Sequence, residues 1–89
     1  MAAEVWIVDD ELLIGLHLSK FFAEHEYAAQ AVKSGEECLE LIRGGSVPDI
    51  ILMDINFGRD RLDGPETTRR IHEIRDVPVV LHSAYTDRE

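Results

Sequence analysis

Apolar and polar positions alternate along this chain in a way that predicts strands and helices in turn. Short apolar runs are typical of strands, whereas apolar residues spaced three and four apart are typical of helices. The expected strands cover about 4–8, 27–32, 49–53 and 79–83, and the expected helices cover about 11–25, 34–43 and the segment that begins at 63. Strands that alternate with helices indicate an α/β fold with a parallel sheet.

Start and stop signals bound the second and third helices. Residues 34–37 read SGEE, which fits a capping box, and Gly44 with Gly45 ends that helix. Residues 63–66 read DGPE, which combines an N-cap, a proline in the first turn and a glutamate at the third position. The residues expected on the buried faces are Ile14, Leu18, Phe21 and Phe22 in the first helix, Cys38, Leu39, Leu41 and Ile42 in the second, and Thr67, Ile71 and Ile74 in the third.

The connections between strands determine the order of the sheet. Right-handed crossovers place helices on both of its faces. The third strand is apolar on both faces, as an interior parallel strand should be. We therefore expect a doubly wound, flavodoxin-like parallel sheet with strand order 2-1-3-4 and a switch point between strands one and three.

Three aspartates follow the two strands that flank this switch point. Asp9 and Asp10 come after the first apolar run, and Asp54 comes after the run at 50–53. Because the carboxyl ends of parallel strands meet at one edge, the three carboxylates should converge there. Converging carboxylates repel one another unless a hard cation joins them. The arrangement predicts an Mg²⁺-assisted phosphoryl-transfer site with an aspartate nucleophile, although each aspartate alone also fits a structural cap.

Composition narrows the possible functions. The 89 residues make one small domain, and the net charge of −9 argues against direct binding to nucleic acid, although an acidic surface can also be merely solvated. The single cysteine, Cys38, allows no internal disulfide and suits a reducing cytoplasm, where we expect the protein to reside. The sequence shows no signal peptide and no apolar segment of membrane length, so no membrane partner is expected.

The ordered motifs resemble the receiver domain of two-component response regulators and hybrid sensor kinases. Each motif alone is weak, but together they fall in the right order and on the expected strands and loops. They are VWIVDDE at 5–11, SGEE at 34–37, PDIILMDIN at 48–56, DG at 63–64 and PVVLHSA at 78–84. The likeness covers nearly the whole chain, so we expect residues 1–89 to be a receiver domain that works in a phosphorelay.

The resemblance implies a role for each residue of the site. Asp54 would be the phosphoacceptor and would also contact the metal. Asp10 would bind Mg²⁺ directly, Asp9 would act through water or by holding the site, and the backbone carbonyl of Asn56 would supply a further oxygen ligand. Ser83 would donate its hydroxyl to a phosphoryl oxygen. The phosphoryl donor would be a histidine kinase or a phosphotransfer domain.

Two features depart from the receiver pattern. The loop at about 57–62 is longer than usual, and the chain stops before the fifth strand and the last helices. A helix start signal at 86–89 has no helix after it, so we expect an incomplete C-terminus. The lysine that receivers carry on the fifth strand has no counterpart, because Lys20 and Lys33 lie in other elements. Strand four would then be an exposed apolar edge that favours self-association.

Other interpretations remain open at this point. A pseudo-receiver would bind partners without taking phosphate, which the shortened chain and the long loop favour and the intact aspartates oppose. An Mg²⁺-dependent aspartyl phosphohydrolase would usually carry a second aspartate two residues after the nucleophile, where this chain has Asn56. We therefore expect a phosphoacceptor rather than an enzyme. Strand alternation sends His82 to the face opposite Ser83, and His82 is interpreted as a packing or partner-contact residue.

Overall fold

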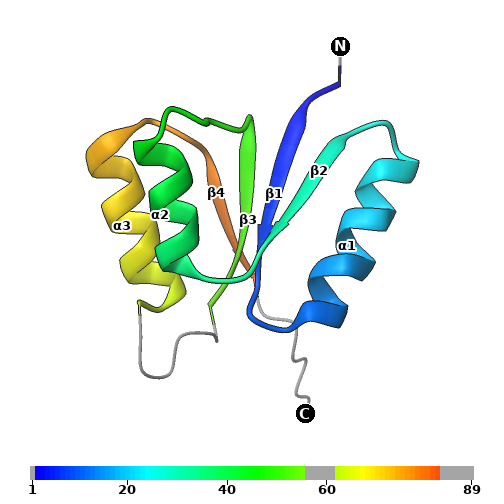
Figure 1. The fold of residues 1–89 in the computed structure, drawn as a ribbon, viewed down its shortest axis with the longest axis horizontal. Coiled ribbons are helices and arrows are strands. Elements are labelled where there is room, and N and C mark those ends of the chain that lie inside the picture. The colour runs from blue at the N-terminus through cyan, green and yellow to red at the C-terminus, as the bar shows by residue number, and fades with distance from the viewer. Residues whose placement is uncertain (1, 56–61, 83–89) are drawn as a thin grey trace.

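A parallel sheet of four strands with helices on both faces forms the fold (Figure 1). The computed structural model describes residues 2–55 and 62–82. In chain order the elements are β1 (Glu4–Val8), α1 (Leu12–Glu24), β2 (Ala28–Val32), α2 (Gly35–Arg43), β3 (Ile50–Asp54), α3 (Gly64–Ile74) and β4 (Val79–His82). The strand order is β2-β1-β3-β4, and all neighbouring strands are parallel. The predicted fold class and strand order are confirmed.

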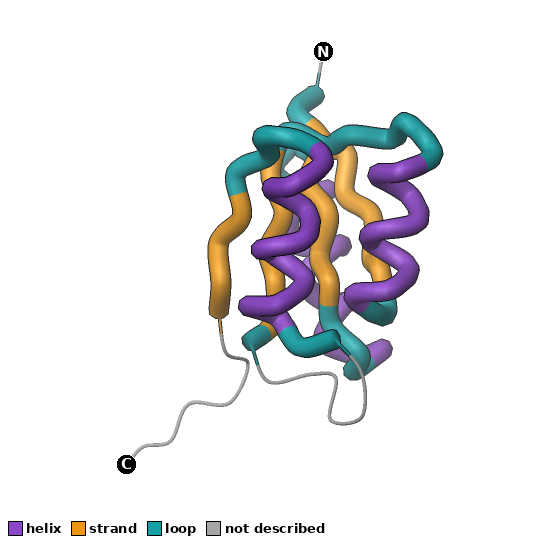
Figure 2. The backbone as a smooth tube through the Cα atoms, turned by 90° about the vertical axis from the view of Figure 1, so that its left-hand side faces the viewer, coloured by secondary structure: helices purple, strands orange, loops and turns teal. Residues whose placement is uncertain are grey.

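The main hydrophobic core lies between the sheet and the two helices α2 and α3. Figure 2 shows these helices side by side in front of the strands, with α1 behind the sheet. The buried side chains of this core are Trp6, Val8, Val32, Cys38, Leu39, Ile42, Ile51, Met53, Ile71 and Val77. Leu41 and Ile74 are half-buried and pack against it, and Thr67 is buried between the helices and the sheet. The predicted buried faces of α2 and α3 are therefore confirmed.

Side-chain caps fix where α2 and α3 begin, next to the carboxyl edge of the sheet. The hydroxyl oxygen of Ser34 accepts the backbone N–H of Glu37 at 3.0 Å. A carboxylate oxygen of Asp63 accepts the backbone N–H of Glu66 at 2.8 Å. Each bond satisfies a backbone donor that has no partner within its own helix, which is typically worth about 1 kcal/mol. Both predicted helix starts are confirmed.

Cys38 belongs to the core and not to a reactive site. Its side chain is fully buried on α2. Burial, with a smaller contribution from the charge of Glu37, raises the pKa of the Cys38 thiol to about 12. A thiol with so high a pKa holds almost no thiolate near neutral pH, so it is a poor nucleophile. The interpretation of Cys38 as a packing residue agrees with this environment.

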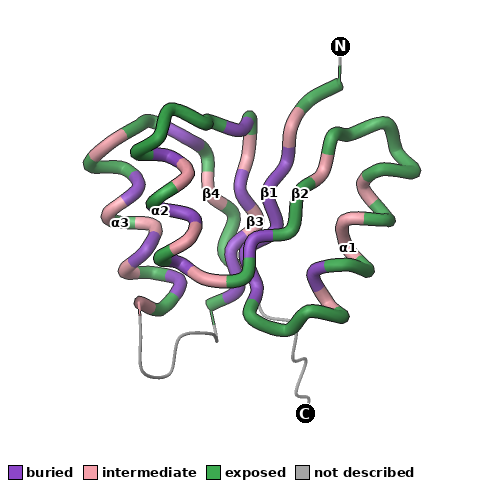
Figure 3. Tube along the Cα trace, viewed as in Figure 1, coloured by how far each residue is buried: buried purple, intermediate pink, exposed green. Residues whose placement is uncertain are grey.

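The helix α1 covers the other face of the sheet much more loosely, as the exposed positions along it show (Figure 3). Ile14, Leu18 and Phe22 are half-buried, but Phe21 is 49% exposed and stacks on His25 with ring centroids 4.4 Å apart. The prediction that Phe21 faces the sheet was wrong, because α1 lies over the narrow surface of β1 and β2 and Phe21 falls at its rim. None of the helices in the described part of the chain is long and apolar enough to cross a membrane.

Candidate functional site

Three carboxylates meet where β1 and β3 end. Asp9 and Asp10 follow β1 directly, and Asp54 is the last residue of β3. One oxygen from each carboxylate can be chosen so that all three lie within 4.8 Å of one another. Asp9 and Asp54 are almost fully buried, at 3% and 2% exposed, whereas Asp10 is exposed. The predicted convergence of these aspartates at the carboxyl edge is therefore what the fold produces.

Asp9 has one satisfied and one unsatisfied oxygen. Its Oδ1 accepts the backbone N–H of Glu11 at 2.8 Å, which also orders the turn into α1. Its Oδ2 is buried and has no hydrogen-bond partner among the described residues. Asp9 therefore orders the turn before α1 without being its N-cap, which is Glu11, and its second oxygen is left available to a ligand.

The electrostatics of Asp9 indicate that a cation belongs beside it. Burial is the main cause that raises the pKa of the Asp9 carboxyl, and the Glu11 N–H partly offsets it. The charges of Asp54 and Asp10 raise this pKa further, while His82 lowers it. A carboxylate held in such a field gains most from a bound positive charge. Hard oxygen donors of this kind suit Mg²⁺, which needs few protein ligands because it keeps several waters.

Asp54 is held from two sides by the backbone. The N–H of the next residue, Ile55, donates to the carbonyl oxygen of His82 at 2.8 Å, which fastens the end of β3 to β4. On the other side α3 begins against the same strand end, and Gly64 packs on the Asp54 carbonyl. A Cβ atom added at Gly64 would come 2.5 Å from that carbonyl oxygen. The start of α3 therefore sets the position of the Asp54 backbone.

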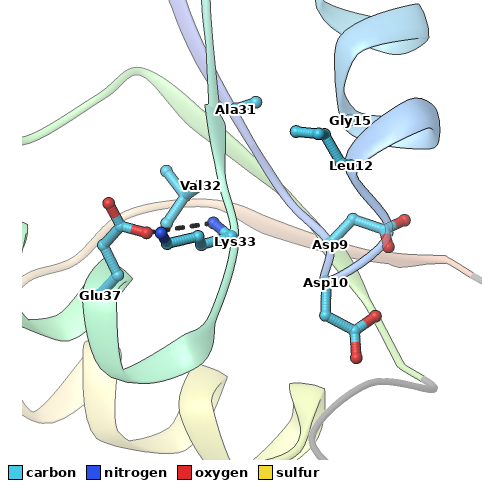
Figure 4. A pocket seen from close by; sticks show the side chains of 8 residues that line it. All are labelled: Asp9, Asp10, Leu12, Gly15, Ala31, Val32, Lys33 and Glu37. Atoms are coloured by element: carbon cyan, nitrogen blue, oxygen red, sulfur yellow. Dashed lines mark hydrogen bonds between the residues drawn. The ribbon is translucent and has the colours of Figure 1, made fainter.

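A pocket opens beside the acidic cluster, between the start of α1 and the end of β2. Its volume is about 400 Å³. The residues that line it are Asp9, Asp10, Leu12, Gly15, Ala31, Val32, Lys33 and Glu37 (Figure 4). Lys33 lies on the wall opposite Asp10, and its backbone N–H donates to Glu37 Oε1 at 3.3 Å. The pocket therefore reaches Asp9 and Asp10 of the cluster, whereas Asp54 is not among its lining residues.

His82 lies closer to the cluster than the sequence interpretation assumed. It is the register partner of Asp54 in the β3–β4 pair, and its charge lowers the pKa of the Asp9 carboxyl. Sequence reasoning placed His82 relative to Ser83 alone. The signal that could have found it is strand register, because the last residue of β4 pairs with the last residue of β3.

Two residues assigned to the site lie outside the described residues. These are Asn56, whose backbone carbonyl was expected to bind the metal, and Ser83, whose hydroxyl was expected to contact a phosphoryl group. The helix start signal at 86–89 also falls outside this range. Their roles stay predictions. The described site consists of the three carboxylates, His82 and the adjacent pocket.

Comparisons with known proteins agree with this geometry. A model of the response regulator receiver domain family matches residues 5–89. The protein-glutamate methylesterase/protein-glutamine glutaminase of Bacillus subtilis (strain 168) is 30% identical over 94% of this chain, but the chain spans only 23% of its length.

Solved structures agree as well. The N-terminal domain of a response regulator/sensory box/GGDEF 3-domain protein from Carboxydothermus hydrogenoformans has a TM-score of 0.88 and 32% identity, over 96% of this chain and 67% of that one. The beryllofluoride-activated NtrC receiver domain has a TM-score of 0.79 and 26% identity, over 98% of this chain and 68% of that one.

Proposed function

Because this chain belongs to the response regulator receiver domain family, we propose that it accepts a phosphoryl group on Asp54 from a histidine kinase or a phosphotransfer domain. The observation that carries this proposal is the meeting of three carboxylates within 4.8 Å at the carboxyl edge of the sheet. A nucleophilic carboxylate needs its charge offset before it can approach a phosphoryl group, and a cation held by its neighbours meets that need.

The proposed transfer balances without any further reagent. One Asp54 oxygen attacks the phosphorus of a phosphohistidine, so that an O–P bond forms while the P–N bond breaks. The departing imidazole takes up a proton and leaves the aspartyl phosphate behind. Mg²⁺, when bound, supplies charge neutralisation for the phosphoryl oxygens. Asp10 would bind the cation directly, and Asp9 would act through water or by holding the site. Asp54 and the carbonyl of Asn56 would be further ligands, and Ser83 would be the hydroxyl donor.

The pocket beside the cluster gives the donor a place to enter. Leu12 and Ala31 line it together with Asp10 and the buried Asp9, next to Asp54 in the acidic cluster. Phosphorylation adds nearly two negative charges at the end of β3, where the cluster is already acidic. A change in the packing at the ends of β3 and β4 is the response we expect.

The role we assign to residues 1–89 is that of a phosphoacceptor and not of an enzyme. Two residues after Asp54 the chain has Asn56, which offers no general acid for steady hydrolysis. The methylesterase activity in the name of the Bacillus subtilis relative belongs to a protein of which this chain spans 23%. A cytoplasmic location and the absence of nucleic-acid binding stay predictions.

Intact mass spectrometry tests the proposed transfer. After incubation with Mg²⁺ and a small phosphodonor such as acetyl phosphate, the chain should gain the mass of one phosphoryl group. The Asp54→Asn variant should gain none, because the amide is not a nucleophile. Asp76→Asn removes the same charge at an exposed position and should behave as the wild type. An unmodified wild type would exclude the transfer for residues 1–89 alone, and the same test on a longer chain would decide between a shortened receiver and a pseudo-receiver.

The apolar edge strand leads to a separate prediction. Among the described residues β4 pairs only with β3, and Val80 and Leu81 are 45% and 44% exposed. Unpaired strand edges with apolar side chains pair readily with other chains. We expect sedimentation to show concentration-dependent self-association, which Val80→Lys suppresses. Leu13→Lys, at an exposed apolar position on α1, should leave it unchanged. A monomer at all concentrations would contradict this prediction.

A further inference from the structure

The strand register places His82 in one row with the two buried carboxylates. Val8 pairs with Met53, so the residues that follow them, Asp9 and Asp54, are level with each other at the end of the sheet. Asp54 in turn pairs with His82 on β4. Register partners in a parallel pair lie side by side on neighbouring strands. His82 therefore flanks Asp54 on the side away from Asp9.

The imidazole of His82 has an unused hydrogen-bonding atom at this place. Its Nε2 is buried and has no hydrogen-bond partner among the described residues. A buried polar atom without a partner costs about 1–3 kcal/mol, so it calls for a partner such as a water, an ion or a ligand. His82 pairs with Asp54, and its charge acts on the pKa of Asp9, so its side chain lies next to the acidic cluster.

A phosphoryl group on Asp54 would supply the missing partner. It brings three strong acceptor oxygens to a residue whose neighbour in the next strand is His82. Neighbouring strands lie about 4.8 Å apart, which is within the reach of an imidazole ring. The neutral ring suffices, because its Nε2–H tautomer is a donor.

We propose that His82 is a phosphoryl-binding residue of this chain, whose Nε2–H donates a hydrogen bond to an oxygen of the phosphoryl group on Asp54. This inference rests on the proposed function. The bond exists only in the phosphorylated state, so it favours that state over the resting one. It also provides a donor from β4 in a chain whose two lysines, Lys20 and Lys33, lie on α1 and beside β2.

The test uses beryllofluoride, a phosphoryl mimic, together with Mg²⁺ and the whole chain. Side-chain ¹H–¹⁵N spectra should show that the Nε2 resonance of His82 shifts when the mimic binds. The control within the same molecule is His72, whose Nε2 lies 2.8 Å from the carbonyl oxygen of Val77 and should not shift. An unchanged His82 resonance with the mimic bound would overturn the proposal.

Two variants separate hydrogen bonding from packing. His82→Leu keeps the bulk and removes the donor, and at saturating Mg²⁺ we expect it to bind beryllofluoride about tenfold more weakly than the wild type. His82→Gln carries an amide N–H near the position of Nε2 and should restore most of the binding. Should the leucine variant fail to fold, the glutamine variant and the wild-type spectra decide the question.

The outcomes also distinguish this inference from the proposed function. Wild-type chain that takes neither the mimic nor a phosphoryl group would overturn both. Wild-type chain that takes them, with His82→Leu binding as tightly as the wild type, would overturn the role of His82 alone. Weaker binding in both variants, with no shift of the His82 resonance, would assign His82 to packing.

Discussion

Replacing Asp9 with asparagine is expected to stabilise the metal-free protein and to weaken Mg²⁺ binding by at least about tenfold. The carboxylate is buried at 3% exposed beside two others, and its pKa is raised because burial disfavours the charge. Asparagine keeps the oxygen that accepts the Glu11 N–H at 2.8 Å, so the turn into α1 is preserved. The substitution removes only the charge. The repulsion from the other two carboxylates is lost with it, and so is a charged group that would help to hold the cation.

The expected increase in the stability of the metal-free Asp9→Asn protein follows from simple electrostatics. Two unit charges about 4 Å apart repel by about 1 kcal/mol even in bulk water, and by more when partly buried. For a domain of this size, about 1 kcal/mol corresponds to about 4–8 °C in the midpoint of thermal unfolding. We therefore expect the variant to unfold several degrees above the wild type without metal and to gain little from added Mg²⁺.

Thermal unfolding with and without Mg²⁺, at low ionic strength and neutral pH, is the measurement. Asp76→Asn is the matched control, because it removes the same charge from an exposed residue that precedes β4 at the opposite edge of the sheet. It should change neither the midpoint nor the response to metal. A metal-free Asp9→Asn protein less stable than the wild type would show that Asp9 serves the fold and not a cation.

The fold could be predicted from the sequence because its determinants are local. The alternation of strands and helices, the caps at Ser34 and Asp63, and the handedness of the crossovers favour a doubly wound sheet, and the order 2-1-3-4 is a common arrangement of it. Convergence of the aspartates then follows, since parallel strands end at one edge. The observed element boundaries differ from the predicted ones by one residue, as at β3, which was expected over 49–53 and includes Asp54.

Features that depend on contacts between distant segments could not be predicted in this way. The exposure of Phe21 depends on how much of the sheet lies beneath α1, which the spacing of apolar residues in α1 does not reveal. His82 joins the site through the register of β4 against β3, which is a relation between segments and not a motif. The pocket beside Asp10 likewise exists only when α1 and β2 are brought together.

Gly64 illustrates both a local sequence signal and a contact between distant segments. Sequence reasoning assigned it to a helix start signal, and it is indeed the first residue of α3. What the sequence does not show is that this residue rests on the end of β3, at the proposed phosphoacceptor Asp54. An added Cβ would lie 2.5 Å from the Asp54 carbonyl oxygen and 3.0 Å from the Ile55 Cα, both of them backbone atoms that cannot rotate away.

Gly64→Ala is therefore expected to destabilise the protein although alanine is the better helix former. The helix preference favours alanine by about 0.5–1 kcal/mol. Overpacking against fixed atoms costs about 1–3 kcal/mol, so the steric effect should dominate. We expect the midpoint of thermal unfolding to fall by roughly 5–10 °C, on the scale of about 4–8 °C per kcal/mol.

The same substitution should slow phosphoryl transfer to Asp54. Either the start of α3 or the end of β3 must move to admit the new methyl group, and a displacement of about 1 Å at a reacting group can cost about a hundredfold in rate. Gly44→Ala provides the control, since Gly44 is exposed at the end of α2 and its Cβ would meet the carbonyl oxygens of Glu40 and Leu41 at 3.4 and 3.5 Å. Denaturation and intact mass over time measure both effects. A Gly64→Ala protein as stable and as rapidly phosphorylated as Gly44→Ala would show that α3 does not position Asp54.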